Sequence, residues 1–212
     1  MISVSYLKSV YSFEETIKAL DKLKNVDFIH LDLMDGNYVK ENNIDIDKIK
    51  SGFKDIEKPK DIHLMVSDPL SYLNDLKDIK PEHITFHPDA VEDPMKVIKA
   101  IKELGIKVGI AINYDVDVEE YEKLYKYADL ILVMSVQAGY GGQEFQKDVI
   151  SKIEYFTNLK DEGEEFILEI DGGVNDIVYH KLERYPIDIF VIGAYICTNE
   201  HFERPLNKLF NK

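Results

Sequence analysis

Residues 29–36 read Ile-His-Leu-Asp-Leu-Met-Asp-Gly, an apolar run that carries a histidine and an aspartate two positions apart. Two similar runs follow, Asp-Ile-His-Leu-Met-Val at 61–66 and Glu-Ile-Asp-Gly-Gly at 169–173. Alternate residues of a β-strand point to the same face, so His30 and Asp32 share one face of their strand. Buried groups of this kind need a charge partner, which a metal ion can supply. The three runs therefore predict buried strands that carry polar groups.

Apolar runs alternate with amphipathic segments along the chain. The runs lie at about 2–5, 26–34, 61–66, 83–87, 106–112, 129–135, 165–171 and 187–192. They are rich in Ile, Val, Leu and Phe, which is typical of parallel strands buried on both faces. Segments with helical spacing lie between them, at 13–23, 45–53, 93–104, 117–127, 143–160, 175–185 and 199–210. The chain therefore repeats a strand, a turn and a helix.

Two of these helices carry clear end signals. Ser12 and Glu15 have the spacing of a capping box at the start of the first helix. Asp93 is placed as an N-cap, Pro94 occupies the first helical position, and Gly105 follows the end of that helix.

Eight strands alternating with helices predict an α/β fold, a (β/α)8 TIM barrel formed as one domain by residues 1–212. A doubly wound open sheet is the alternative, and it would gather polar residues at one crevice. Instead, polar residues or glycine occur near the C-terminal ends of most strands: His30, Asp32, His63, His87, Asn113, Ser135, Asp171 and Gly193. Barrel enzymes carry their active sites at that end, so this distribution favours the barrel.

The net charge of the 212-residue chain is -14 at pH 7. This acidic balance argues against nucleic acid and against docking on an anionic membrane surface. A small phosphorylated substrate stays compatible, because backbone amides bind phosphate without lysine. The single cysteine, Cys197, excludes an internal disulfide and fits a reducing compartment. Residues 1–8 lack the signal-peptide pattern, and no run reaches the roughly 20 apolar residues of a membrane span, so we expect a cytoplasmic protein.

His30, Asp32, His63 and Asp171 are the candidate metal ligands. Incidental polar residues at strand ends would be a simpler explanation for any one of them. Four such residues on three strands at the expected functional rim favour a site instead. Two imidazoles and two carboxylates suit one Zn²⁺, Fe²⁺, Mn²⁺ or Co²⁺ ion, and also provide two carboxylates for proton transfer. A structural zinc site would favour cysteines, so we expect a catalytic one.

Glycine turns follow three consecutive late strands: 135–143, 172–173 and 193–194. They are either ordinary tight turns or a phosphate site, which barrels often build from their late loops. Met34, Met65 and Met134 also lie at strand ends, where spacing alone favours core packing.

The remaining single residues are assigned simpler roles. We expect His83, His180 and His201 to be solvated, Cys197 to be packed, and His87 to line a pocket or support a ligand.

Taken in order, these motifs resemble the ribulose-phosphate 3-epimerase family. The matching stretches are LDLMDG (31–36), HLMV (63–66), FH (86–87), KVGIA (107–111), VMSV (133–136), GYGGQ (139–143) and DGGV (171–174). The resemblance extends from Ser5 to Gly193, nearly the whole chain.

The resemblance implies a metal-dependent (β/α)8 barrel that inverts carbon 3 of a ketose phosphate, most simply D-ribulose 5-phosphate to D-xylulose 5-phosphate. It implies His30, Asp32, His63 and Asp171 as ligands of one divalent ion, and Asp32 and Asp171 as the acid/base pair that acts through an enediolate. The implied substrate contacts are Ser5, Met34, Met65, Met134, Gly139, Gly141, Gly142, Gly172, Gly173, Gly193 and Ala194. The methionines would form an apolar cushion rather than plain core. Family members are often dimers or hexamers, so we expect a homo-oligomer.

Several loops depart from the family pattern, at 37–41, 114–116, Ala138, Asp89 and Ala194. The reaction type is therefore better determined than the substrate, and D-allulose 6-phosphate is the rival. A non-catalytic ketose-phosphate sensor is a second alternative, although it would have little reason to keep both carboxylates. A metallohydrolase, a Schiff-base aldolase and the Asp-x-Lys-x-x-Asp decarboxylases are disfavoured because their motifs are absent.

Overall fold

The computed structural model describes residues 1–210, in which eight parallel strands close into a barrel. The strands are β1 (Ile2–Ser5), β2 (Phe28–Met34), β3 (Lys60–Met65), β4 (His83–Phe86), β5 (Lys107–Ile112), β6 (Leu130–Met134), β7 (Ile167–Asp171) and β8 (Ile189–Val191). Pairing of β1 with β8 closes the sheet, with Ile2 beside Phe190. This closure confirms the predicted (β/α)8 barrel and excludes the open sheet. Residues 211 and 212, the end of the predicted domain, lie outside the described range.

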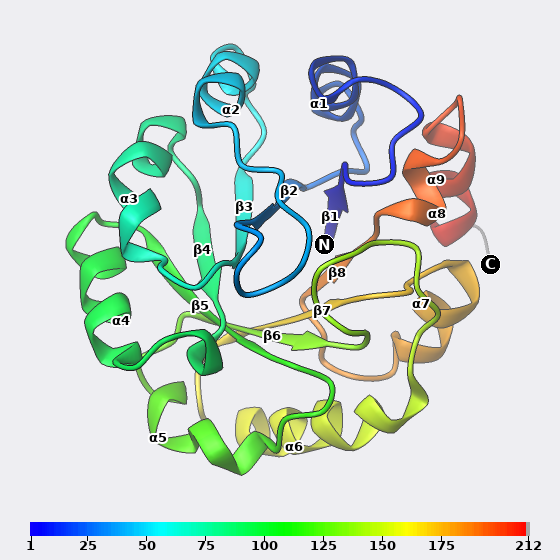
Figure 1. Cartoon of the computed structure of the whole chain (residues 1–212). Coiled ribbons are helices and arrows are strands. Elements are labelled where there is room, and N and C mark those ends of the chain that lie inside the picture. The colour runs from blue at the N-terminus through cyan, green and yellow to red at the C-terminus, as the bar shows by residue number, and fades with distance from the viewer. Residues whose placement is uncertain (211–212) are drawn as a thin grey trace.

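Helices surround the strands, which lie at the centre of the view in Figure 1. They are α1 (Phe13–Asp21), α2 (Ile46–Phe53), α3 (Leu70–Leu76), α4 (Pro94–Glu103), α5 (Glu122–Tyr125), α6 (Ile150–Asp161), α7 (Asp176–Leu182), α8 (Ala194–Cys197) and α9 (Glu203–Phe210). Short 3₁₀ helices lie at η1 (Lys77–Ile79), η2 (Pro88–Ala90), η3 (Val118–Tyr121) and η4 (Lys147–Val149). Among residues 1–210, no helix has both the length and the apolar character to cross a membrane.

Local hydrogen bonds explain where several helices begin. The predicted capping box of α1 is present, with Ser12 and Glu15 each accepting a backbone N–H from the other. Asp93 caps α4 through the amide of Lys96, and Gly105 follows that helix with a φ of 74°. A residue with a side chain would be strained at that φ, so glycine ends the helix at low cost.

The strands have two different environments on their two faces. Ile29, Leu31 and Leu33 of β2 are fully buried and belong to the large apolar layer between barrel and helices. The alternate residues of the same strand, His30 and Asp32, are buried in the barrel interior. Strand alternation thus separates the packing residues from the polar ones, as the sequence predicted.

Register brings the interior polar residues of neighbouring strands together. Asp32 of β2 lies beside His63 of β3, and His30 lies beside Asp61. On the other side of β2, Ser5 of β1 lies beside His30.

Three predicted helices differ from the observed ones. The segment 117–127 contains only η3 and the four-residue α5, and like charges at Glu119 and Glu122, three positions apart, weaken a regular helix there. The helix predicted at 143–160 begins only at Ile150, because residues 143–146 are held by the preceding loop. The helix predicted at 199–210 begins at Glu203, which keeps Pro205 in the first turn.

One observed helix was not predicted, and one prediction about a single residue was wrong. The sequence reading assigned no bounds to α3, whose N-cap position is Pro69 and lacks a side-chain cap. His83 was expected to be solvated, but it is the first residue of β4 and is 1% exposed, with its ring 5.5 Å from that of Phe28. Cys197 is buried, as predicted.

Candidate metal and substrate site

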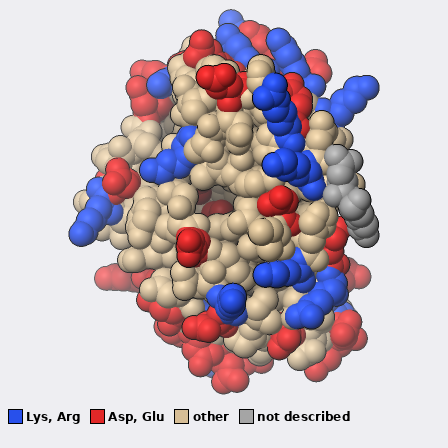
Figure 2. All heavy atoms as spheres, turned by 90° about the vertical axis from the view of Figure 1, so that its right-hand side faces the viewer, with Lys and Arg blue, Asp and Glu red and all other residues tan. Residues whose placement is uncertain are grey.

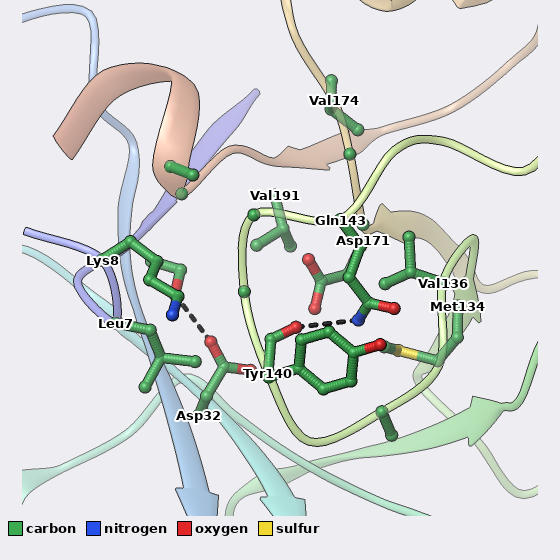
Figure 3. Close-up of a pocket in the computed structure, with 18 of the residues that line it drawn as sticks. Leu7, Lys8, Asp32, Met134, Val136, Tyr140, Gln143, Asp171, Val174 and Val191 are labelled. Carbon is green, nitrogen blue, oxygen red and sulfur yellow. Dashed lines mark hydrogen bonds between the residues drawn. The ribbon is translucent and has the colours of Figure 1, made fainter. Parts of the chain in front are cut away.

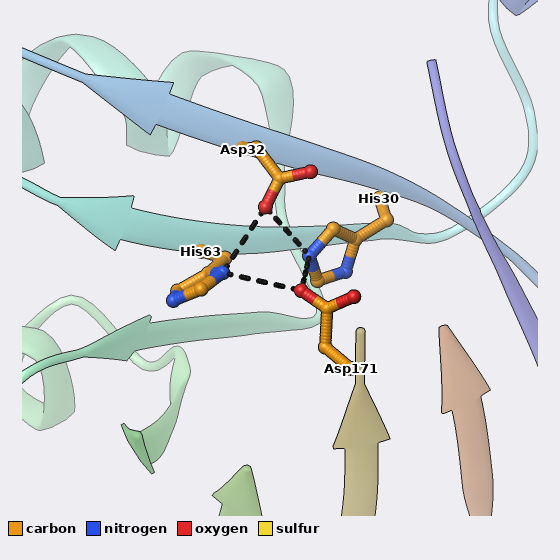
Figure 4. A group of neighbouring side chains, drawn as sticks. All are labelled: His30, Asp32, His63 and Asp171. Carbon is orange, nitrogen blue, oxygen red and sulfur yellow. Dashed lines mark hydrogen bonds and ion pairs between the residues drawn. The ribbon is translucent and has the colours of Figure 1, made fainter. Parts of the chain in front are cut away.

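His30, Asp32, His63 and Asp171 converge inside the C-terminal end of the barrel (Figure 4). Nε2 of His30 is 3.3 Å from Oδ1 of Asp32 and 4.0 Å from Oδ2 of Asp171. Nδ1 of His63 is 3.1 Å and 3.8 Å from the same two oxygens. The barrel therefore brings the four predicted ligands to one point from three strands.

The geometry of these four atoms fits a metal ion. All of them lie within 4.8 Å of one another. A tetrahedral ion with bonds of about 2.1 Å would place neighbouring ligand atoms about 3.4 Å apart, which is close to the observed separations. Nε2 of His30 is buried without a hydrogen-bond partner among the described residues, an arrangement that a metal bond would satisfy. The His/Asp cluster can therefore bind a metal.

Both histidine rings are oriented by a second buried group. Nδ1 of His30 is 2.7 Å from Oδ2 of Asp61, so a proton on Nδ1 leaves the lone pair of Nε2 facing the cluster. Nε2 of His63 is 2.8 Å from Nε2 of His87. When Nε2 of His63 donates to His87, its Nδ1 presents a lone pair to the two carboxylates. His87 can accept, because burial, followed by the proximity of His63, lowers its pKa well below the usual value.

The two aspartates of the cluster have opposite electrostatic environments. Burial would raise the pKa of Asp32, but His30 and His63 lower it well below its usual value. Burial and the neighbouring Asp32 raise the pKa of Asp171 to about 6. Burial opposes a charge on His30, but Asp32 and Asp61 raise its pKa well above normal. One carboxylate is thus held ionised while the other readily takes a proton.

A second polar layer lies beneath the cluster and was missed by the sequence reading. Oδ2 of Asp61 accepts hydrogen bonds from Ser3 Oγ at 2.8 Å and from His30. Glu169 is fully buried, and burial together with Asp61 raises its pKa well above the usual value. Asp61 and Glu169 each precede a predicted ligand by two residues on the same strand face. The alternation that identified His63 and Asp171 would also have identified these two carboxyl groups.

A cavity of about 340 Å³ opens above the cluster (Figure 3). Its walls include both predicted catalytic residues, Asp32 and Asp171. They also include most of the predicted substrate contacts: Ser5, Met65, Met134, Gly139, Gly141, Gly142, Gly172, Gly173, Gly193 and Ala194. His30 and His63 do not line it, because both rings lie behind the carboxylates at 0% exposure. Met34 is also buried and is not among the lining residues.

The turns after β6 and β7 pack against each other closely enough to require glycine. Gly173 has a φ of 63°, and an added Cβ would lie 2.2 Å from the backbone nitrogen of Phe145. Gly172 and Gly142 also have positive φ, at 119° and 84°. The glycine segment is not followed directly by a helix, although a helix was predicted from residue 143, because Gln143 to Gln146 separate the segment from η4 and α6. The backbone of these turns is thereby exposed to the cavity.

A hydrogen-bonded group supports the His87 side of the cluster. The ring of Tyr38 lies 5.0 Å from that of His87, and its hydroxyl donates to Asp89 at 3.0 Å. Nδ2 of Asn113 donates to the Tyr38 hydroxyl at 2.7 Å. Tyr38 belongs to segment 37–41, where the sequence departs from the family pattern. No periodicity signals its position, because it lies in a loop.

Comparison with known proteins gives consistent matches. Residues 1–197 match the model described as the ribulose-phosphate 3 epimerase family. A ribulose-phosphate 3-epimerase from Helicobacter pylori is 33% identical over 200 residues, covering 94% of this chain and 92% of the relative. One from Mycobacterium tuberculosis is 33% identical over 175 residues, covering 82% and 76%.

Solved structures share the fold at low sequence identity. The 3-hexulose-6-phosphate synthase from Salmonella typhimurium has a TM-score of 0.69 and 16% identity, covering 98% of this chain and 95% of that one. The N-(5'-phosphoribosyl)anthranilate isomerase from Pyrococcus furiosus has a TM-score of 0.65 and 12% identity, covering 100% and 99%. At these identities, the likeness concerns the barrel alone.

Proposed function

The chain belongs to the ribulose-phosphate 3-epimerase family and is an isomerase, and we propose that it interconverts D-ribulose 5-phosphate and D-xylulose 5-phosphate. The observation that carries the proposal is the pair of carboxylates, Asp32 and Asp171, which line one cavity beside two histidines. Inversion at carbon 3 needs a base on one face of the substrate and an acid on the other. Strands β2 and β7 are separated by β1 and β8 in the barrel, so their aspartates approach the cavity from different sides.

The proposed mechanism assigns one proton transfer to each aspartate. One carboxylate removes the proton from carbon 3, which leaves an enediolate, and the other returns a proton to the opposite face. In the metal-free protein the pKa of Asp32 is lowered and that of Asp171 is raised, so the two carboxyl groups have different environments on the two sides of the cavity. Ser5 donates to Oδ2 of Asp32 at 2.6 Å and would hold that carboxylate in place. Asp32 and Asp171 exchange roles when the reaction runs in reverse.

We propose that His30, Asp32, His63 and Asp171 hold one divalent ion. Two nitrogen and two oxygen ligands suit Zn²⁺, Fe²⁺, Mn²⁺ or Co²⁺. When bound, such an ion supplies Lewis acidity that stabilises negative charge developing on the sugar oxygens. Asp61 and His87 would keep the two imidazoles in the orientation that this requires.

The remaining cavity walls would bind the rest of the substrate. The backbone of Gly141, Gly142, Gly173 and Gly193 would receive the phosphate group, with Gly139, Gly172 and Ala194 shaping the same wall. Met65 and Met134 would form an apolar surface that limits water near the reacting carbon, whereas Met34 would support them from behind. The oligomeric state and the cytoplasmic location stay predictions.

Side-by-side assays test this proposal. Protein of known metal content should convert D-ribulose 5-phosphate with a higher kcat/KM than D-allulose 6-phosphate, and should lose activity on chelation. Replacing Asp32 with Asn should lower kcat by about 10²–10⁴-fold. A higher kcat/KM for D-allulose 6-phosphate would identify that sugar as the substrate instead. Tight binding of both sugars without turnover would instead indicate a non-catalytic binding protein.

A further inference from the structure

Lys8 lies in the loop between β1 and α1 and lines the cavity next to Leu7 (Figure 3). Its stem lies against the glycine turn that follows β6. A Cβ added to Gly141 would lie 3.2 Å from Cγ of Lys8 and 3.8 Å from Cε. The residue as a whole is exposed, so the ammonium group is hydrated while the stem contacts protein.

Loops that follow three different strands meet around Lys8. A Cβ added to Gly142 would lie 3.9 Å from Cβ of Ala194, and one added to Gly193 would lie 3.2 Å from Cβ of Ser5. The loops after β1, β6 and β8 therefore meet at one end of the cavity. Ser5 links this meeting point to the carboxylates, because its Oγ donates to Oδ2 of Asp32 at 2.6 Å.

Charge is unevenly distributed over the cavity walls. Asp32 and Asp171 are acidic, and Lys8 is the only basic residue among the lining residues that the structure describes. The ion pairs that lysines form within residues 1–210 involve Lys50, Lys107 and Lys160, so Lys8 takes part in none of them. The cavity thus holds one positive charge without a protein partner, in a chain with a net charge of -14.

This arrangement matches the two ends of a sugar phosphate. The reacting carbons must lie against the two aspartates, which leaves the glycine turns that meet beside Lys8 as the part of the cavity wall for the phosphate. Backbone amides there offer dipoles but no net charge, and a phosphate dianion approaching an acidic protein is repelled. From this placement we infer that Lys8 binds the substrate phosphate and sets the affinity for phosphorylated over unphosphorylated sugars. The inference rests on the proposed function.

The matched variants are Lys8→Met, which keeps the stem against Gly141, and Lys8→Arg, which keeps the charge. A hydrogen bond to a charged group is worth about 1.5–3 kcal/mol, or roughly 10–100-fold in binding. Lys8→Met should raise KM for D-ribulose 5-phosphate at least about tenfold and change kcat less than about twofold, the pattern of lost uniform binding. Lys8→Arg should restore KM to within about threefold of the wild-type value.

The control is Lys18→Met, which removes the same charge from an exposed position of α1 that does not line the cavity. It should leave KM unchanged, which separates a local contact from the loss of net charge. The kcat/KM of the wild-type protein should fall with added salt, and that of Lys8→Met should fall less steeply. An unchanged KM in Lys8→Met, or an equal rise in Lys18→Met, would overturn the inference.

A second measurement does not depend on the assigned reaction. Inorganic phosphate is titrated calorimetrically into the metal-loaded wild-type protein and the Lys8 and Lys18 variants. Phosphate binding should weaken at least about fivefold in Lys8→Met alone. If no ketose phosphate is epimerised but this loss is seen, the proposed function fails and the Lys8 site stands. If wild-type protein binds no phosphate, or Lys8→Met binds it equally well, the Lys8 inference fails whatever the reaction.

Discussion

Asp32 and Asp171 are the same residue type, but their surroundings shift the pKa values of their carboxyl groups in opposite directions. Both line the same cavity and both lie near His30 and His63. Burial would raise the pKa of Asp32, but the two imidazoles together outweigh burial and lower it, whereas burial and Asp32 raise the pKa of Asp171 to about 6. Two carboxyl groups whose pKa values are driven apart are typical of an acid/base pair.

The raised pKa of Asp171 predicts a pH-dependent stability in the metal-free protein. Because the folded state favours the protonated carboxyl, its contribution to stability is full below about pH 4 and is lost as pH rises through about 6. Above that pH the ionised, buried carboxylate destabilises the folded state, and Asp171→Asn removes this destabilisation. It should therefore raise the free energy of unfolding by on the order of 2 kcal/mol at pH 7.5 and by little at pH 4. Urea unfolding in the presence of a chelator measures the difference.

The control is Asp55→Asn at an exposed position. This variant should show no comparable gain at pH 7.5. A gain from Asp171→Asn that is equal at both pH values would contradict the assigned environment of the carboxyl group.

Asp61 contacts no part of the cavity, yet it should control metal binding. Its carboxylate accepts a hydrogen bond from Nδ1 of His30, which leaves Nε2 facing the cluster. Replacing Asp61 with Asn removes the negative charge that favours this ring orientation. Second-layer changes of this kind typically cost about 10–100-fold in metal affinity. Competition of Asp61→Asn with a chromogenic chelator should show a loss in that range. The exposed Asp78→Asn variant should bind metal as the wild-type protein does, and equal affinities in Asp61→Asn would refute the positioning role.

Among the elements, strands were predicted within about three residues and helices less accurately. Buried parallel strands produce continuous apolar runs, which give a direct signal for all eight strands. The start of α6 depends instead on a contact that the local pattern does not contain, the amide of Gln146 bonded to the carbonyl of Ser135. The starts of α1 and α4 were predicted well because their caps are local.

The same distinction applies to the candidate site. His30, Asp32, His63 and Asp171 could be selected from strand alternation and from their place near strand ends. Tyr38 and Lys8 could not, because both lie in loops whose paths depend on tertiary packing. The roles of all these residues stay predictions, while their proximity is a property of the fold.

The turn after β7 offers a test of how the glycine segment is packed. Gly173 and Gly105 have similar φ values of 63° and 74°, so alanine meets the same backbone strain at both. At Gly105 an added Cβ finds nothing within 4 Å, whereas at Gly173 it would lie 2.2 Å from the nitrogen of Phe145. Gly105→Ala should cost about 1 kcal/mol and Gly173→Ala at least about 2 kcal/mol more.

Thermal or urea unfolding of the two variants provides the comparison. We expect Gly173→Ala also to weaken phosphate binding, because the turns after β6 and β7 must separate. Equal losses of stability in the two variants would contradict the close packing of these turns.

Considered as a whole, the molecule is an acidic barrel whose candidate metal ligands converge at the C-terminal end of its strands. Figure 2 shows acidic side chains gathered along the lower edge of one face, and lysines and arginines at its top, on its right side and at the lower right, without a continuous basic stripe. With a net charge of -14 the protein repels an anionic substrate at a distance, so productive binding depends on the favourable groups within the cavity.

Epimerisation in deuterium oxide tests the two-carboxylate mechanism most directly. Metal-loaded protein converts D-ribulose 5-phosphate while NMR follows carbon 3 of the product. A base on one face and an acid on the other must deliver a solvent-derived hydron, so D-xylulose 5-phosphate should carry deuterium at carbon 3 from the first turnovers. A product that forms at the normal rate and keeps the original hydrogen at carbon 3 would contradict the mechanism.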